Sequence, residues 1–151
     1  MLSLLLSWVL AMGGLAVDSL GVGGRPVDIG VEWQAVELRE PLTSKTGNPR
    51  LLLYLRNLDA LGVERKRMVE ALPRVLPPGS IAAIAYDKAG SRYPFTHTGY
   101  SFFRGMPGLV LERDDVPRGT TFFRLELRAV RRLDDVVMIW LDSLGGTRPD
   151  G

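Results

Sequence analysis

Short apolar runs separated by glycine- and proline-containing turns constrain the fold of this chain more than any other feature. The turns recur so often that only strands or very short helices fit between them. They are centred on Pro41, Gly47–Pro49, Pro77–Gly79, Gly90–Ser91, Gly105–Gly108, Pro117–Gly119 and Gly145–Gly146. Strands do not alternate with long helices in this pattern, so a nucleotide-binding α/β fold is not expected.

Several of the runs have the two-residue period of a half-buried strand. Residues 27–38 alternate, with Val31 and Trp33 on the apolar side, until the phase breaks near Ala35. We expect a bulge at that break. Residues 50–57 instead form a nearly continuous apolar run, which is typical of a strand buried on both faces.

The last two runs, Thr120–Val130 and Asp135–Asp142, predict an antiparallel hairpin with a charged turn between them. In the first run, Phe123 begins the apolar face, and Arg124 and Arg128 belong to the face that meets water. The second run is apolar on both faces. The pattern favours the two strands as part of a hydrophobic core.

Together these runs predict an all-β domain over residues 27–144, built as a single antiparallel β-sandwich of the immunoglobulin-like or jelly-roll type. One segment is ambiguous. Residues 64–72 predict a short helical turn that ends before Pro73, although residues 67–76 also fit an edge strand that tolerates Pro73 at its margin. We expect residues 145–151 to be a disordered tail.

The first 17 residues carry no charged side chain and are mostly apolar. Residues 1–16, expected to be helical, fit a secretory signal peptide, since a membrane span needs about 20 apolar residues. Two alternatives stay open, namely a single membrane anchor through residues 1–17 and a buried N-terminal element of the domain. Residues 17–26 are glycine-rich and predict a flexible linker. The first two interpretations place the domain in the periplasm or outside the cell, and the anchor interpretation attaches it to the inner membrane.

Composition excludes several classes of function. The chain has no cysteine, which removes disulfides, thiol catalysis and cysteine-ligated zinc. Its net charge is only +2, and positive and negative side chains are interleaved, so no nucleic-acid partner is expected. Arginine outnumbers lysine 16 to 3, a composition common in bacteria with GC-rich genomes.

An aromatic stretch near the middle of the chain supplies the candidate contact residues. Aromatic side chains flanked by arginine are typical of protein and sugar contact surfaces. Alternate aromatic residues on a strand are also typical of a core, so both interpretations stay open. The candidate ligand- or partner-contact residues are Tyr93, Phe95, His97, Tyr100 and Met106.

Catalytic and metal chemistry are weakly supported. His97 is the only histidine, and it would need a carboxylate such as Asp87 or Asp115 to serve a hydrolase. Paired acids such as Asp114–Asp115 and Asp134–Asp135 could hold calcium, but no calcium-loop motif is present. We therefore expect no catalytic residue, no metal and no cofactor.

The sequence thus favours a non-enzymatic recognition module of the cell envelope that binds another envelope protein or a polysaccharide. A small envelope hydrolase that uses His97 and a carbohydrate-binding domain are the alternatives.

Overall fold

The computed structural model describes residues 25–142, and these residues fold mainly into antiparallel β-sheet. The strands are β1 (Val27–Ile29), β2 (Gln34–Val36), β3 (Leu42–Ser44), β4 (Arg50–Leu55), β5 (Ile81–Asp87), β6 (Arg92–Ser101), β7 (Gly108–Glu112), β8 (Thr120–Ala129) and β9 (Leu133–Leu141). The helical elements are η1 (Asp59–Leu61), η2 (Arg65–Arg67), α3 (Met68–Val75) and η3 (Phe103–Gly105). The predicted helix at residues 1–16 and the predicted tail at residues 145–151 lie outside the described residues, as does most of the predicted linker.

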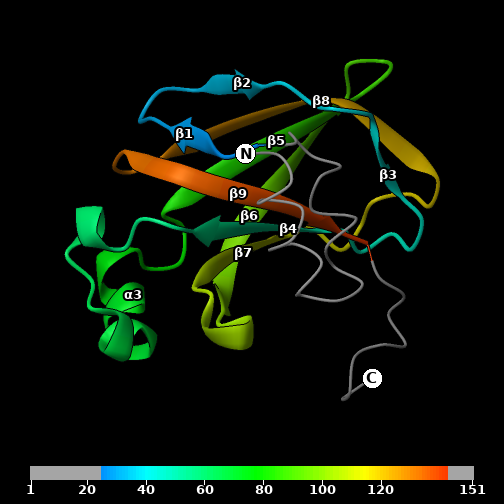
Figure 1. The fold of residues 1–151 in the computed structure, drawn as a ribbon. Coiled ribbons are helices and arrows are strands. Elements are labelled where there is room, and N and C mark those ends of the chain that lie inside the picture. Colours follow the sequence, from blue (N-terminus) through cyan, green and yellow to red (C-terminus); the bar gives the residue numbers. More distant parts are fainter. Residues whose placement is uncertain (1–24, 143–151) are drawn as a thin grey trace.

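All nine strands belong to one sheet that nearly closes on itself. The strand order is β1-β9-β4-β7-β6-β5-β8-β2, and β3 also pairs with β8. The sheet comes near to closing where β8, the strand next to the end of this path, approaches β1. There the N–H of Ala129 in β8 donates a hydrogen bond of 2.9 Å to the carbonyl of Gly30, directly after β1. The result is a barrel-like sheet wrapped around an apolar interior (Figure 1). The all-β antiparallel prediction is confirmed, whereas a sandwich of two stacked sheets is not, because the described strands form a single continuous sheet.

The predicted hairpin of the last two strands is wrong. β8 pairs with β5, β2 and β3, while β9 pairs with β1 and β4. Val27 and Ile29 of β1 lie opposite Val136 and Leu133 of β9. The first described strand therefore lies between the last two, and alternation alone could not reveal this because strand pairing is not a local property.

The phase of two strands also differs from the prediction. The expected long strand over residues 27–38 is two short strands, β1 and β2, separated by a bend at residues 30–33. In β8 the buried aromatic residue is Phe122, and Phe123 is 51% exposed. Tyr86 of β5 pairs with Arg124, but the next residue, Asp87, pairs with Phe122, so Phe123 is an extra residue that forms a bulge. Because of this bulge, the first residues of β8 point to the opposite face from the one predicted.

The interior of the barrel is filled by inward-facing side chains from most of the strands. Its fully buried members include Leu51, Leu53, Leu109, Leu111, Phe122, Leu125, Leu127 and Val136. A second, smaller cluster lies on the outer side of β4 and β9. β4 is accordingly buried on both faces, as its continuous apolar run predicted.

The predicted helical turn is present, but it begins and ends later than expected. α3 follows η2 and continues through Pro73 to Val75. Proline lacks the N–H that would bond four residues back, so the helix gives up one hydrogen bond at that point. Leu72 and Leu76 are fully buried on either side of it, and the Tyr100 hydroxyl donates a 2.6 Å hydrogen bond to the Leu76 carbonyl. Packing against the barrel thus compensates for the proline.

Candidate functional site

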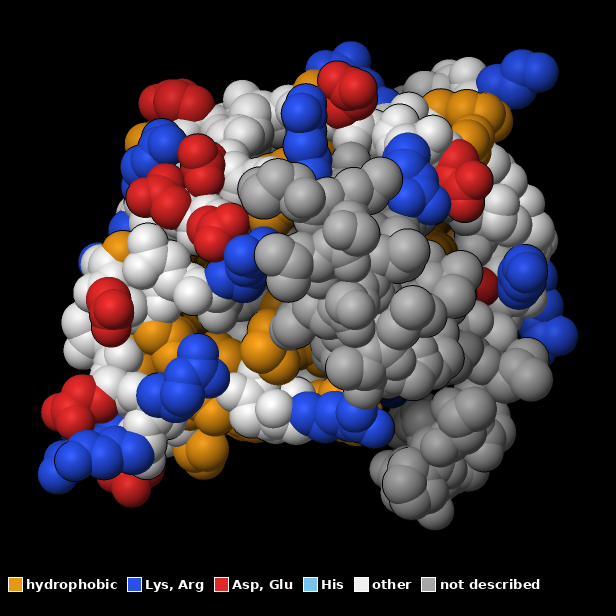
Figure 2. Space-filling view, viewed as in Figure 1, with side chains coloured by type: hydrophobic (Ala, Val, Ile, Leu, Met, Phe, Trp, Pro, Cys, Tyr) orange, Lys and Arg blue, Asp and Glu red, His pale blue; other side chains and the backbone are white. Residues whose placement is uncertain are grey.

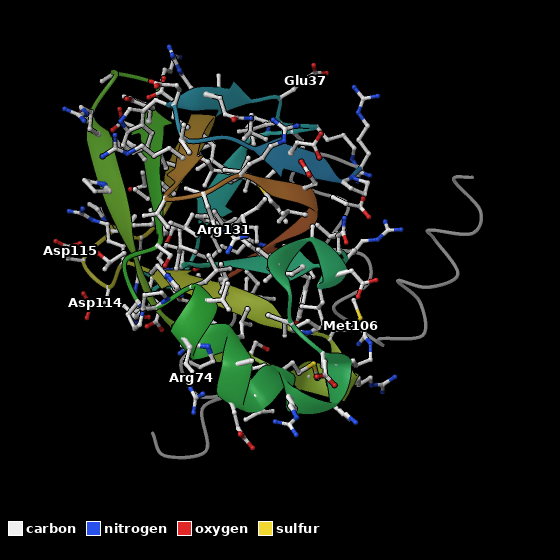
Figure 3. The ribbon with its side chains drawn as sticks, turned by 90° about the vertical axis from the view of Figure 1, so that its left-hand side faces the viewer. Glu37, Arg74, Met106, Asp114, Asp115 and Arg131 are labelled. Atoms are coloured by element: carbon white, nitrogen blue, oxygen red, sulfur yellow. The ribbon has the colours of Figure 1, made fainter. Side chains whose placement is uncertain are left out.

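The five predicted contact residues do not share one open surface. Tyr93, Phe95, His97 and Tyr100 lie on β6, and Met106 follows η3 (Figure 3). Phe95 and His97 point into the barrel and are 3% and 1% exposed. The other three side chains are half-buried. Any ligand contact made by this stretch in the present structure would have to come from the half-buried members.

Three of the inward-facing aromatic rings on different strands pack against one another. The Phe95 and Phe122 rings both contact the Trp140 ring, with centroids 5.8 and 5.9 Å apart. Tyr93 meets Phe122 edge-on at 5.2 Å and carries the Arg113 guanidinium over its ring. Edge-to-face pairs of this kind stabilise cores. The aromatic stretch of β6 therefore acts largely as packing, which is the core interpretation that the sequence left open.

His97 occupies an environment suited to a neutral imidazole. Its Nδ1 accepts a hydrogen bond of 3.2 Å from the Ser80 backbone N–H, so that nitrogen carries a lone pair. Burial lowers the pKa of His97 below its ordinary value, because a charged ring would lose its hydration. Among the described residues, no partner reaches its Nε2. The ring is positioned as a hydrogen-bond acceptor inside the barrel.

The carboxylates that could have served a histidine-dependent hydrolase are engaged elsewhere. Asp87 accepts hydrogen bonds from the backbone N–H groups of Ala89 and Ser91 and so shapes the β5–β6 turn. Asp115 pairs with Arg113 at 2.7 Å. The geometry brings neither acid to His97.

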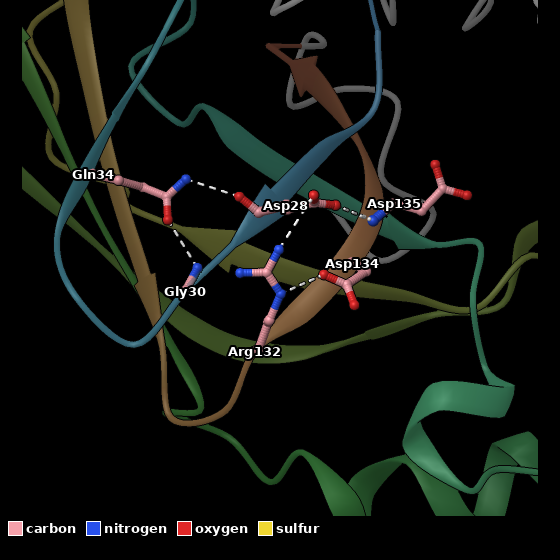
Figure 4. Close-up of polar contacts among 6 residues, drawn as sticks. All are labelled: Asp28, Gly30, Gln34, Arg132, Asp134 and Asp135. Atoms are coloured by element: carbon pink, nitrogen blue, oxygen red, sulfur yellow. Dashed lines mark hydrogen bonds and ion pairs between the residues drawn. The ribbon is translucent and has the colours of Figure 1, made fainter.

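The acidic pairs also have structural partners. The Asp28 carboxylate accepts a 2.9 Å hydrogen bond from the Asp135 N–H, and Arg132 bridges Asp28 and Asp134 (Figure 4). Arg56 lies 3.4 Å from the Asp135 carboxylate. This network attaches β1 to the start of β9.

Asp114 and Asp115 follow β7 and lie on the opposite side of the molecule from Met106 (Figure 3). Within residues 25–142, no group of three or more acidic or histidine side chains is placed to hold a metal ion.

A different surface presents exposed apolar side chains next to an arginine. Val31, Trp33 and Val130 are 55%, 40% and 65% exposed, and the Arg128 guanidinium lies 4.9 Å from the Trp33 ring centroid. We call these four residues the Trp33 surface. A shallow hollow of about 350 Å³ opens beside them. It is lined by Val31, Gly79, Ser80, Ala82, Arg128, Ala129 and Val130.

The bend that carries Val31 and Trp33 is held by its neighbours. The Gln34 side chain accepts a 2.8 Å hydrogen bond from the Gly30 N–H and donates one of 2.8 Å to the Asp28 carbonyl (Figure 4). The side-chain amide of Gln34, after the bend, thus holds two backbone groups that come before or at the start of the bend. Because both ends are also paired into the sheet, Val31 and Trp33 project from a fixed position.

Sequence reasoning missed the Trp33 surface because the alternation assigned Val31 and Trp33 to the buried face. Gly30 was the available signal, since a glycine within an alternating run often marks a bend or bulge. The remaining large exposed hydrophobic residues do not belong to the Trp33 surface or line its hollow. They are Val69, Phe103 and Phe123.

Comparison with protein-family models, with curated proteins and with solved structures finds no match to this chain. Within residues 25–142, no helix has both the length and the apolar character needed to cross a bilayer.

Proposed function

We propose that this domain is a non-enzymatic recognition module that binds a partner protein through the Trp33 surface. The observation that carries the proposal is the exposed Trp33–Arg128 pair, set between Val31 and Val130 at the mouth of a hollow. Tryptophan and arginine are the side chains most enriched among residues that dominate binding energy at protein interfaces.

Arg128 defines the chemistry of the partner. Among the described residues, no carboxylate lies within ion-pair distance of it, and its guanidinium instead stacks on Trp33. A partner that approaches the hollow would meet an apolar rim and one positive charge. The surface therefore fits a segment that presents an apolar side chain next to an aspartate or glutamate.

The hollow is less suited to a sugar. Its floor offers few free hydrogen-bonding groups, because the Ser80 hydroxyl donates to the Pro77 carbonyl and its N–H donates to His97. Sugar sites need several polar groups to pair with hydroxyls. Carbohydrate binding nevertheless remains the second candidate, since an exposed tryptophan can stack on a sugar ring. We keep an envelope location as a prediction, because it depends on residues 1–17.

A site-specific photo-cross-linker tests the proposal in the cells that produce the chain. A benzophenone amino acid at Val31 should form an adduct with a defined protein. The same amino acid at Phe123 should not, although Phe123 is exposed to a similar extent. The adduct should disappear when Arg128→Glu is added. Equal adducts from both positions, or adducts that do not depend on Arg128, would contradict the proposal.

The sugar alternative has its own measurement. Soluble glycans should leave Trp33 fluorescence unchanged if the partner is a protein. A saturable change that is abolished by Trp33→Phe would assign the surface to a sugar instead.

A further inference from the structure

The turn that joins α3 to β5 connects the buried His97 ring with the hollow beside the Trp33 surface. This turn, residues 77–80, contributes Gly79 and Ser80 to the lining of the hollow. The Ser80 N–H donates a 3.2 Å hydrogen bond to His97 Nδ1. The Ser80 carbonyl accepts a 2.9 Å hydrogen bond from the N–H of Val130, which is part of the Trp33 surface. The backbone of one residue therefore joins the interior ring to the surface.

The hydrogen bonds around His97 suit a neutral ring and not a charged one. Because Nδ1 is an acceptor, the neutral ring carries its proton on Nε2, which no partner among the described residues reaches. A protonated ring would carry a second N–H at Nδ1, pointing at the Ser80 N–H. Two donors would then face each other, and neither ring N–H would have an acceptor. The charged ring does not fit this arrangement unless the turn or the ring moves.

The turn can leave His97 without giving up all of its own hydrogen bonds. The Ser80 N–H also lies 3.0 Å from the Pro77 carbonyl, which accepts a second hydrogen bond from the Ser80 hydroxyl. Pro77, Pro78 and Gly79 are exposed to solvent. Apart from the bond to Nδ1, the turn is attached to β6 by the Gly79 N–H, which donates to the His97 carbonyl at 3.1 Å. Displacement of the turn would therefore break few contacts.

The elements packed around the His97 ring offer no charge that would hold a proton there. On β6 the titratable neighbour is Tyr100, whose ring lies edge-on at 5.3 Å and whose hydroxyl donates to a backbone carbonyl. On β7 the residue opposite His97 is Leu111, and Glu112 pairs with an arginine at the surface. The inward-facing residues of β5 are apolar, and the charged residues of α3 are exposed. Figure 2 likewise shows charged side chains of both signs on the outside of the molecule.

We propose that a proton taken up by His97 displaces the turn over residues 77–80, breaks the hydrogen bond between Val130 and Ser80, and so opens the Trp33 surface in mildly acidic conditions. This inference rests on the proposed function, because it describes how binding at the same surface is regulated. A partner would bind to the closed form, in which Gly79 and Ser80 line the hollow, and would be released by acid.

The direction of the pH dependence follows from burial. Burial lowers the pKa of His97, and the Gly99 backbone raises it by less, so the closed form binds a proton less readily than an ordinary histidine does. In the open form the ring meets water and regains a pKa of about 6.5. The closed form is therefore favoured above about pH 6.5, and the open form becomes more populated as the pH falls below that value.

Amide hydrogen exchange of the free protein tests the opening without any partner. The protection factor of the Val130 N–H should fall by up to about tenfold per pH unit below about pH 6.5. The Thr120 N–H, at the other end of β8, donates to the Pro117 carbonyl and is the matched control, whose protection should stay constant. His97→Asn keeps an acceptor for Ser80 but does not titrate, so Val130 should stay protected at every pH. The comparison of Val130 with Thr120 needs no variant, and it stands even if His97→Asn does not fold.

The photo-cross-linker at Val31 then connects the opening with binding. In extracts, the adduct should decline between pH 7 and about 5.5 in parallel with the protection of Val130, and it should persist in His97→Asn. Constant protection of Val130, an equal fall at Thr120, or a fall that His97→Asn does not prevent would overturn the inference. An adduct that ignores pH while Val130 loses protection would overturn it as well. An absent adduct at both pH values would instead contradict the proposed function, and the exchange measurement alone would decide whether His97 opens the turn.

Discussion

β8 and β9 follow one another along the chain, yet their outer sides differ completely. The outer side of β8 carries charged side chains, including the ion pair of Arg124 with Glu126 and the exposed Arg128. The outer side of β9 carries Val137 and Ile139, which are buried. Strict alternation in β8 and its absence in β9 already distinguished the two in the sequence. The difference teaches that a strand with apolar residues at successive positions can be buried on both faces, even in a single-layered barrel.

The largest effect that tests this comparison lies within β8 itself. Phe122→Ala should lower the free energy of unfolding by about 3–5 kcal/mol, because it empties a fully buried aromatic position. Phe123→Ala, one residue along and half exposed, should cost less than about 1 kcal/mol. Urea denaturation of both variants measures the two changes in the free energy of unfolding. Equal losses would contradict a bulge at Phe123, because both aromatic side chains would then be equally buried.

A somewhat smaller effect compares the two outer sides. Ile139→Ala should lower the free energy of unfolding by about 2–5 kcal/mol, as for a core residue. Arg124→Ala should change it by no more than about 1 kcal/mol, because its ion pair with Glu126 is partly exposed to solvent. The same denaturation experiment applies. If Ile139→Ala behaves like Arg124→Ala, the outer side of β9 is not a buried face in solution.

The smallest expected effect is the pH dependence of the free energy of unfolding, which tests whether water is excluded from the barrel interior around His97. Burial lowers the pKa of His97 in the folded protein, so below about pH 6.5 the unfolded chain binds a proton more readily than the folded one. The free energy of unfolding should therefore be highest above that pH and fall by at most about 1.4 kcal/mol per pH unit below it. His97→Asn keeps an acceptor for the Ser80 N–H and should flatten the profile between pH 7 and 5.5. A wild-type profile that is already flat would mean that water reaches His97.

The local sequence pattern was sufficient to predict that strands form, but it was insufficient to predict which strands pair with one another. The alternation of β8 and the apolar run of β4 placed those strands and fixed the all-β class. The pairing of β1 with β9 could not be predicted from the sequence, because the two strands are far apart along the chain and no turn connects them. Local irregularities account for the other errors, since the extra residue at Phe123 puts Phe122 on the buried face in its place, and the bend that begins at Gly30 turns Val31 and Trp33 outward.

The same limits apply to the candidate site. The sequence identified an aromatic stretch but could not tell whether its rings faced water, and the structure turns Phe95 and His97 inward. It placed Trp33 inside, whereas the bend held by Gln34 turns it outward. Recognition surfaces of this kind depend on where the regular pairing of strands stops, and the amino-acid pattern alone does not predict that position.

The contact between Asp28 and Asp135, which lie 107 residues apart along the chain, also has a consequence for biosynthesis. β1 leaves the ribosome early, but its pairing partner β9 is the last of the described strands to be translated. The barrel can therefore close only after β9 has emerged, and until then β1 and β4 lack a neighbour. Proteins dominated by such long-range contacts fold slowly. A nascent chain halted before β9 should accordingly depend on a chaperone to stay soluble.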